Sequence, residues 1–456
     1  MGSSKEVKKS SPSTPEPGST PTTSSPASAV TSRTSTPTPG GKVDQQVAPD
    51  GKAQDDSSKL RTFLSILKKF IGVTDIAAVR FSLPAQLLEP IPNLEYWHYL
   101  DRPEAFVAIG DSKDELGRML GCLRFWFTKD LKYVKGKPCK PYNSTLGEFF
   151  RCQFEVEDTG DTGKKVKVAY LTEQTSHHPP VSAYYVDCPD KGISARGFDQ
   201  LSAKFTGTSV RVIPGSFNEG IYITLHRWND ETYNLTHPAA YLGGFLRGNL
   251  YVTVADTCFV TCPNTKLRVI LHYLEEGYFG KVQNKVEGVI YRCPDPSKDT
   301  TAKVKDVPEK DILGRIEGNW TDKVYFSYGS KDFKKTADED KVLLIDVNPL
   351  YPAAKICPPM EEQLPNESRK FWNDVTEAIV TKQYSRATTV KQELEERQRE
   401  RARERTETKK DWKPRFFTAA TEPRGRPELS EEGLAAVKGL HEGNWHLEPP
   451  EEYGAL

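Results

Sequence analysis

The residues best suited to chemistry lie in the octapeptide Glu-Gln-Thr-Ser-His-His-Pro-Pro, residues 173–180. Pro179 favours an extended His178, and neighbouring extended residues point to opposite faces, so we expect His177 and His178 to diverge. Diverging rings do not favour one shared metal ion. They suit donors that approach a multi-oxygen group, such as a phosphate, from two directions. Taken alone, such a pair more often has a hydrogen-bonded structural role.

The octapeptide lacks the features of a hydrolase site. Ser176 and His177 are neighbours whose side chains should diverge, and no Gly-x-Ser-x-Gly turn surrounds the serine. The glycine-rich run 243–249 lacks the Gly-Lys-Ser/Thr ending of a phosphate-binding loop and leads into a strand-like segment. We therefore expect a protein that is not an enzyme.

The composition argues against several further classes. A formal net charge of zero over 456 residues does not favour a nucleic-acid partner. No stretch approaches the roughly 20 apolar residues that span a bilayer, and the N-terminus lacks the apolar core of a signal peptide. Among the cysteines only Cys258 and Cys262 are close, and nothing completes a zinc-type spacing. We expect buried thiols, no metal, no cofactor and a cytoplasmic location.

The N-terminal part of the chain separates into a tail and a helix. Residues 1–56 are rich in Ser, Thr and Pro, which predicts a disordered tail. In residues 57–72 apolar side chains recur at helical spacing and basic ones occupy other positions. This helix either packs as an ordinary surface helix or covers an apolar opening and meets an anionic membrane. Its apolar residues include Leu60, Phe63, Leu64 and Leu67.

The middle of the chain should be mainly β. A helical region is expected over residues 90–130, including a helix over 113–128. From 146 to 347, short runs alternate apolar and polar residues and are separated by turns, which predicts many antiparallel strands. So many strands require two sheets or a closed barrel, and a barrel of more than about eight strands can hold a ligand.

The C-terminal region, residues 360–456, is predicted to be helical. The segment 389–408 is almost wholly charged, which indicates a solvated helix or one held by ion pairs. Lys391, Glu395 and Arg399 share one stripe of it. Taken alone, such a stripe is most often an exposed set of ion pairs, each contributing about 0.2–0.5 kcal/mol.

Three motifs together resemble those of a known family. The octapeptide matches the Glu-Gln-x-Ser-His-His-Pro-Pro signature of the oxysterol-binding-protein-related family of lipid-transfer proteins. Residues 140–148 and 391–399 resemble two further motifs, Lys-Pro-x-Asn-x-x-Leu-Gly-Glu and Lys-x-x-x-Glu-x-x-x-Arg, in the expected order. The resemblance spans about residues 58–420 and indicates a short, fungal-like member. It implies an α+β, mainly β fold: a large antiparallel β-barrel around a lipid tunnel, with an N-terminal helical lid and C-terminal helices.

The resemblance also implies a function and the residues that carry it. Family members exchange phosphatidylinositol 4-phosphate for a sterol or phosphatidylserine, so we expect a protein peripheral at membranes, such as endoplasmic reticulum contact sites, that touches anionic surfaces transiently. The alternatives are a lipid sensor with little transfer and a structural adaptor. The resemblance assigns phosphoinositide binding to Lys140, Asn143, His177, His178, Lys391, Glu395 and Arg399. It suggests that the tunnel and lid include Leu60, Phe63, Leu64, Leu67, Leu83, Leu87, Trp97, Tyr133, Tyr142 and Asp199. For Trp97 and Tyr133, a place in the aromatic core is an equal alternative.

One position departs from the sterol-carrying members. They often have Gly-aromatic-Asn-Gln shortly after the signature, whereas this chain has Asp199 in place of the amide. The Leu83-Pro84 pair resembles phosphatidylserine-carrying members as much as sterol-carrying ones. The second lipid is therefore left open between a sterol and phosphatidylserine.

Overall fold

The computed structural model describes residues 56–77, 83–136, 140–158, 160, 163–245, 250–274, 284–418 and 425–449. The chain divides into two units, residues 1–48 and 49–456, and every described residue belongs to the second. The predicted tail lies outside the described residues except for Asp56, where helix α1 begins.

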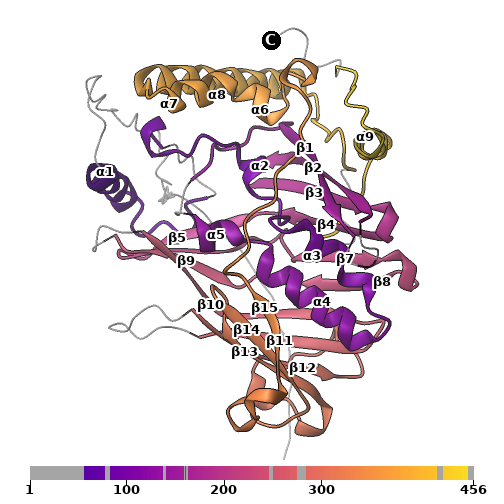
Figure 1. Cartoon of the computed structure of the whole chain (residues 1–456). Helices are drawn as coiled ribbons and strands as arrows, with labels where there is room; N and C mark the ends of the chain where they lie inside the picture. The colour runs from indigo at the N-terminus through magenta and orange to yellow at the C-terminus, as the bar shows by residue number, and fades with distance from the viewer. Residues whose placement is uncertain are drawn as a thin grey trace, which may run out of the picture. The chain divides into compact units, whose positions relative to one another are not determined.

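One antiparallel sheet dominates the described part of the chain (Figure 1). Its fifteen described strands run in the order β1-β2-β3-β4-β7-β8-β10-β11-β12-β13-β14-β15, with β9, β6 and β5 branching from β10. The mainly β, antiparallel fold predicted from the sequence is confirmed. The described strand pairings form one continuous sheet that ends at β1 and β15, and none of them joins these two ends.

The strands fall within the predicted range 146–347. Their bounds are β1 Phe149–Glu157, β2 Lys165–His177, β3 Pro180–Cys188, β4 Ile193–Asp199, β5 Leu201–Phe205, β6 Val210–Pro214, β7 Ile221–Leu225, β8 Glu231–Leu235, β9 Ala239–Gly243, β10 Tyr251–Cys262, β11 Leu267–Tyr273, β12 Lys285–Arg292, β13 Ile312–Asn319, β14 Lys323–Tyr328 and β15 Lys341–Asp346.

Helices precede and follow the sheet along the chain. Their bounds are α1 Asp56–Lys68, α2 Asn93–Tyr96, α3 Pro103–Val107, α4 Glu115–Thr128, α5 Leu131–Lys135, α6 Ser368–Phe371, α7 Asn373–Val380, α8 Tyr384–Thr408 and α9 Glu431–Glu442, and a short 3₁₀ helix, η1, spans Ala85–Leu87. The helix predicted over 113–128 begins at Glu115, because the Asp114 carboxylate caps it by accepting from the Gly117 N–H.

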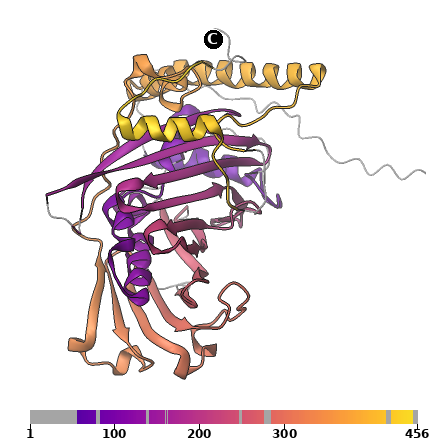
Figure 2. The ribbon, with the colours of Figure 1, turned by 90° about the vertical axis from the view of Figure 1, so that its right-hand side faces the viewer.

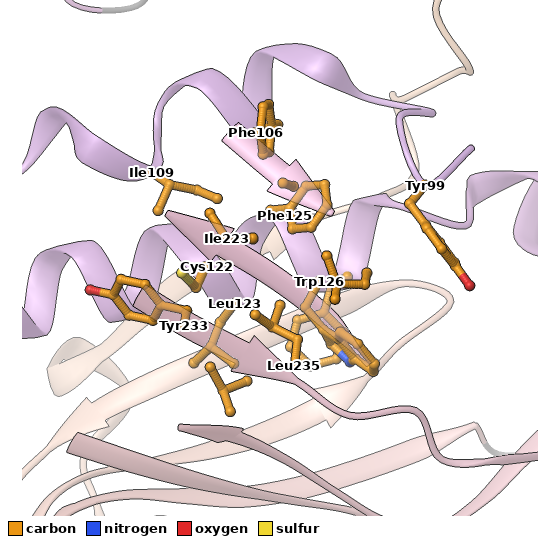
Figure 3. Close-up of a cluster of buried hydrophobic side chains, with 14 of the residues drawn as sticks. Tyr99, Phe106, Ile109, Cys122, Leu123, Phe125, Trp126, Ile223, Tyr233 and Leu235 are labelled. Atoms are coloured by element: carbon orange, nitrogen blue, oxygen red, sulfur yellow. The ribbon is translucent and has the colours of Figure 1, made fainter. Parts of the chain in front are cut away.

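The main core lies between helices α3 and α4 and one face of the sheet. Figure 3 shows Phe106 and Phe125 from these helices packed together, with Trp126 of α4 near Leu235 of β8. Helix α4 is buried along most of its length, so it covers the strands and fixes the segment that precedes it.

The C-terminal part of the chain packs against the first strands. Helix α9 lies along the sheet, where Figure 2 shows it beside the strands, and its Ala436, Val437 and Leu440 contact the β1–β2 surface. The rings of Phe149 and Phe416 are 4.8 Å apart. The segment that precedes α9 is thus packed onto β1 through Phe416.

Candidate functional site

The histidine pair lies at the hairpin that joins β2 to β3. His177 is the last residue of β2 and pairs with Pro180, so His178 and Pro179 form the turn. Both histidines are exposed, and their ring centroids are only 4.5 Å apart. The predicted divergence of the two rings is therefore wrong, because strand alternation ends at His177 and does not extend into the turn. The rings instead form one adjacent pair.

Backbone hydrogen bonds join the octapeptide to the motif at residues 140–148. The Gly147 N–H donates to the Gln174 carbonyl over 3.0 Å, and the Gln174 N–H donates to the Glu148 carbonyl over 2.8 Å. Two motifs that are separated in sequence therefore meet at the end of β2.

Each of these two motifs contains a buried glutamate that attaches it to a distant segment of the chain. Glu148 accepts from the Ser368 hydroxyl over 2.7 Å and from the Trp372 indole N–H over 3.1 Å. Glu173 accepts from the backbone N–H groups of Arg415 and Phe416 over 2.7 and 2.8 Å. Burial raises the pKa of both carboxyls to about 7.

Sequence reasoning gave Glu148 and Glu173 no role, although both belong to the motifs. The available signal was a glutamate inside or directly before a run of strand-like residues, since a carboxylate buried there must find donors. This pattern does not identify the hydrogen-bond donors, which come from residues 368–372 and 415–416.

The third motif approaches Lys140 from helix α8. Lys140 is half-buried and donates to the Asn143 side-chain oxygen over 2.7 Å. Lys391, which is buried, donates to Glu395 over 2.8 Å. Burial, together with the charge of Lys391, lowers the pKa of Lys140 to about 8. The two ammonium groups are thus close enough to repel each other.

Arg399 lies one turn further along α8 than Glu395. Its Nε donates to Glu396 over 2.7 Å, and its distance to the nearest Glu395 oxygen is 4.0 Å. Of the predicted stripe, Lys391 and Glu395 form a tight pair, and Arg399 turns toward its own acidic neighbour.

Packing explains why Lys391 is buried in so polar a helix. Ala387, Lys391 and Leu394 follow one another at i, i+4 and i+7, so they share the face of α8 that packs toward η1 and α7. Four residues predicted for the tunnel or lid lie in the same apolar cluster or pack against it: Phe63, Leu83, Leu87 and Tyr142. The Tyr142 ring lies 4.9 Å from that of Trp372.

The predicted lid residues lie on α1. Leu67 is buried and Leu60, Phe63 and Leu64 are partly buried, all in one cluster with residues of β5, β6 and β9. The rings of Phe63 and Phe245 are 5.9 Å apart. Figure 1 shows α1 next to this branch of the sheet.

The remaining predicted tunnel residues, Trp97, Tyr133 and Asp199, lie outside these two clusters. The half-buried rings of Trp97 and Tyr133 are 5.8 Å apart. Asp199 accepts from the Tyr99 hydroxyl over 2.6 Å, and burial raises the pKa of Asp199 to about 7. The sequence did not single out Tyr99, whose ring lies beside those of Tyr184 and His237.

The described residues contain neither a candidate membrane span nor a candidate metal cluster. No helix among them is long and apolar enough to cross a bilayer. No group of three or more His, Cys, Asp or Glu side chains among them could hold a metal ion.

Comparisons with known proteins place the motifs in a family. The family model described as oxysterol-binding protein matches residues 62–438. The chain belongs to the oxysterol-binding protein family. Oxysterol-binding protein-like protein 1 of Schizosaccharomyces pombe is 40% identical, over 84% of this chain and 92% of its own length. Human oxysterol-binding protein-related protein 9 is 28% identical, over 80% of this chain and 47% of its own length.

Solved structures of the same family share the fold. The Osh1 ORD domain in complex with ergosterol has a TM-score of 0.65 at 20% sequence identity, covering 86% of this chain and 90% of that domain. The Osh3 ORD of Saccharomyces cerevisiae in complex with PI(4)P has a TM-score of 0.57 at 16% identity, covering 84% and 93%. At these identities the likeness establishes the architecture.

Proposed function

We propose that this chain is a lipid exchanger that binds phosphatidylinositol 4-phosphate and, in its place, a sterol or phosphatidylserine. The observation that carries the proposal is the convergence of Lys140 and Lys391 from distant segments. Burial and Lys391 together lower the pKa of Lys140 to about 8, so part of the cost of charging Lys140 is repulsion between the two ammonium groups. A phosphate between them would offset that repulsion and gain charge-assisted hydrogen bonds.

The neighbouring side chains supply what the rest of the headgroup needs. Asn143, already hydrogen-bonded to Lys140, would contact a phosphate oxygen, and Glu395 would accept from inositol hydroxyls. The adjacent exposed rings of His177 and His178 present ring nitrogens at the hairpin beside this motif. Arg399 would add positive charge from helix α8.

The second lipid would use the apolar interior, with α1 as the lid. Related domains solved in complex with ergosterol and with PI(4)P support a site that takes either class of lipid. Competition for one site lets a phosphoinositide gradient drive transport of the other lipid. The protein would act without chemical conversion, from the cytoplasm, by touching an anionic membrane such as that at endoplasmic reticulum contact sites.

Transfer between vesicles tests the proposal. Donor vesicles would carry labelled phosphatidylinositol 4-phosphate, and acceptors would carry a sterol or phosphatidylserine. We expect His177→Ala/His178→Ala and Lys140→Ala each to lower transfer about tenfold or more, because each removes a charged or polar contact worth about 1.5–3 kcal/mol. Arg403→Ala is the matched control, since Arg403 is an exposed cation of the same helix α8.

The outcomes separate the alternatives. Transfer that persists in both site variants would contradict the phosphate site. Lipid extraction with little transfer by the wild type would favour a sensor, and no extraction of any lipid would favour an adaptor. Mass spectrometry should recover both lipids chemically unchanged, whereas a converted lipid would show that the protein is an enzyme.

A further inference from the structure

A pair of thiols outside the three motifs lies at the β1 edge of the sheet. The segment that leads to α6 crosses β1 at Gln153 and Ile356, which exchange both backbone hydrogen bonds over 2.8 Å. The next residues in this antiparallel register are Cys152 and Cys357. They form a directly opposed pair that does not share backbone hydrogen bonds.

This position has the geometry that a disulfide requires. In such a non-hydrogen-bonded pair, the Cα atoms are typically about 4.5 Å apart and both side chains project from the same face. Disulfides span Cα separations of about 4.4–6.8 Å. No large backbone movement would therefore be needed to join the two sulfur atoms.

The two thiols already interact with each other. A hydrogen bond between them lowers the pKa of Cys357 and, after burial, contributes to the raised pKa of Cys152. Cys152 is fully buried in the main core, and Cys357 is half-buried and packs against the same core. Cys357 is therefore the member of the pair that a small solute can reach.

The charges around Cys357 favour its thiolate. Two cations, Lys355 and Arg369, act on Cys357 and lower its pKa, and the one opposing carboxylate is Glu95. Glu95 accepts from Arg369 over 2.6 and 2.9 Å and from Lys355 over 3.4 Å, so these two cations and one carboxylate leave a net positive charge beside Cys357. Since the thiolate is the reactive form of cysteine, these charges activate Cys357 over a thiol in an apolar core.

We propose that Cys152 and Cys357 form an oxidisable pair that closes a disulfide when a hydroperoxide reacts with Cys357. The Cys357 thiolate attacks the peroxide, so an S–O bond forms, the O–O bond breaks, and the leaving oxygen takes a proton to give an alcohol or water. The Cys152 sulfur then displaces the oxygen of the sulfenic acid. That oxygen leaves as water with the Cys152 proton. Two thiols are oxidised and one hydroperoxide is reduced.

The disulfide would tie the connector between β15 and α6 to β1. One residue before Cys152, Arg151 forms a buried ion pair with Glu367, at 3.2 Å, where the same connector enters α6. The covalent bond would thus reinforce the attachment of α6, α7 and α8 to the sheet. This inference stands on the β1 edge alone and does not require the proposed lipid exchange.

Peptide mapping of the full chain tests the pair directly. The reduced protein would be treated with hydrogen peroxide, free thiols would be alkylated, and peptides would be separated without reductant. We expect one linked peptide containing Cys152 and Cys357, lighter by two hydrogen atoms and lost on reduction. Cys258 and Cys262, close in sequence and both buried, are the matched control and should be recovered alkylated after unfolding.

Single variants test the order of events. In Cys152→Ala, we expect the sulfenic acid of Cys357 to persist and to be labelled by a cyclic 1,3-dione, and in Cys357→Ser we expect no such label on Cys152. Wild-type thermal unfolding should shift upward by several degrees on oxidation and return with reductant. Oxidised, folded wild type without the linked peptide, or linkage of Cys258 to Cys262 at equal yield, would overturn the proposal.

Discussion

At the scale of single residues, Lys140 should give phosphoinositide binding a pH dependence. Its pKa is lowered to about 8, so the ammonium form is lost as the pH rises through that value. Binding to vesicles that contain phosphatidylinositol 4-phosphate should weaken about tenfold between about pH 7 and about pH 9, because one charge-assisted contact disappears. Co-flotation with vesicles measures this. The Lys140→Arg variant stays charged, so its binding should vary less with pH than that of the wild type. Wild-type binding that is equally tight at both pH values would contradict the role of Lys140.

Asp199 should control the choice of the second lipid. The buried carboxyl, with a pKa raised to about 7, can donate a hydrogen bond only while it is protonated, a form lost as pH rises. It faces the Tyr99 hydroxyl and feels the charges of Asp130, Lys129 and Lys132. Sterol extraction should therefore be greater at about pH 6 than at about pH 8. The Asp199→Asn variant should extract sterol equally well at both pH values, because the amide donates a hydrogen bond at either. If this variant has the same lipid preference as the wild type, residue 199 does not select the second lipid.

At the scale of elements, Glu173 attaches the C-terminal segment to the end of β2. Glu173→Ala would leave the buried N–H of Phe416 and the partly buried N–H of Arg415 without their acceptor and should cost on the order of 3 kcal/mol. Urea unfolding measures the loss, and limited proteolysis should cut near residues 411–418 in the variant. Equal unfolding free energies for variant and wild type would contradict this role.

The Glu173 carboxyl should also make the unfolding free energy depend on pH. Its pKa rises from 4.5 to about 7 on folding, so it contributes stability below about pH 4.5 that is lost as the pH rises through about 7. Compared with Glu173→Gln, the wild type should therefore lose more unfolding free energy between those values, by on the order of 3 kcal/mol. Parallel slopes for the two proteins would contradict it.

Elements set by local pattern could be predicted, and contacts between distant segments could not. Helix α4 and the range of the strands follow from periodicity, which each segment carries in its own sequence. The predicted divergence of the His177 and His178 rings was wrong, because the orientation of His178 depends on where the hairpin turns. The burial of Lys391 and the register that opposes Cys152 to Cys357 depend on partners far along the chain, which no local pattern specifies.

At the scale of the whole molecule, α1 should retain bound lipid. One face of this helix packs on the sheet, and we expect the other face to contact the membrane. Leu67 is buried against the β5, β6 and β9 branch, whereas Lys68 is exposed beside it. Leu67→Asp places a charge in that apolar contact, so α1 should detach and bound lipid should leave faster.

The matched variant Lys68→Asp leaves the packing intact and should instead weaken binding to anionic vesicles by about 1 kcal/mol or more, with lipid release unchanged. Fluorescent-lipid release and vesicle co-flotation measure the two effects separately. Deleting residues 1–55, which precede α1, should change neither quantity, because α1 begins at Asp56. Equal lipid release from the Leu67→Asp protein and the wild type would show that α1 does not close the site, while a large effect of the deletion would show that the tail takes part in exchange.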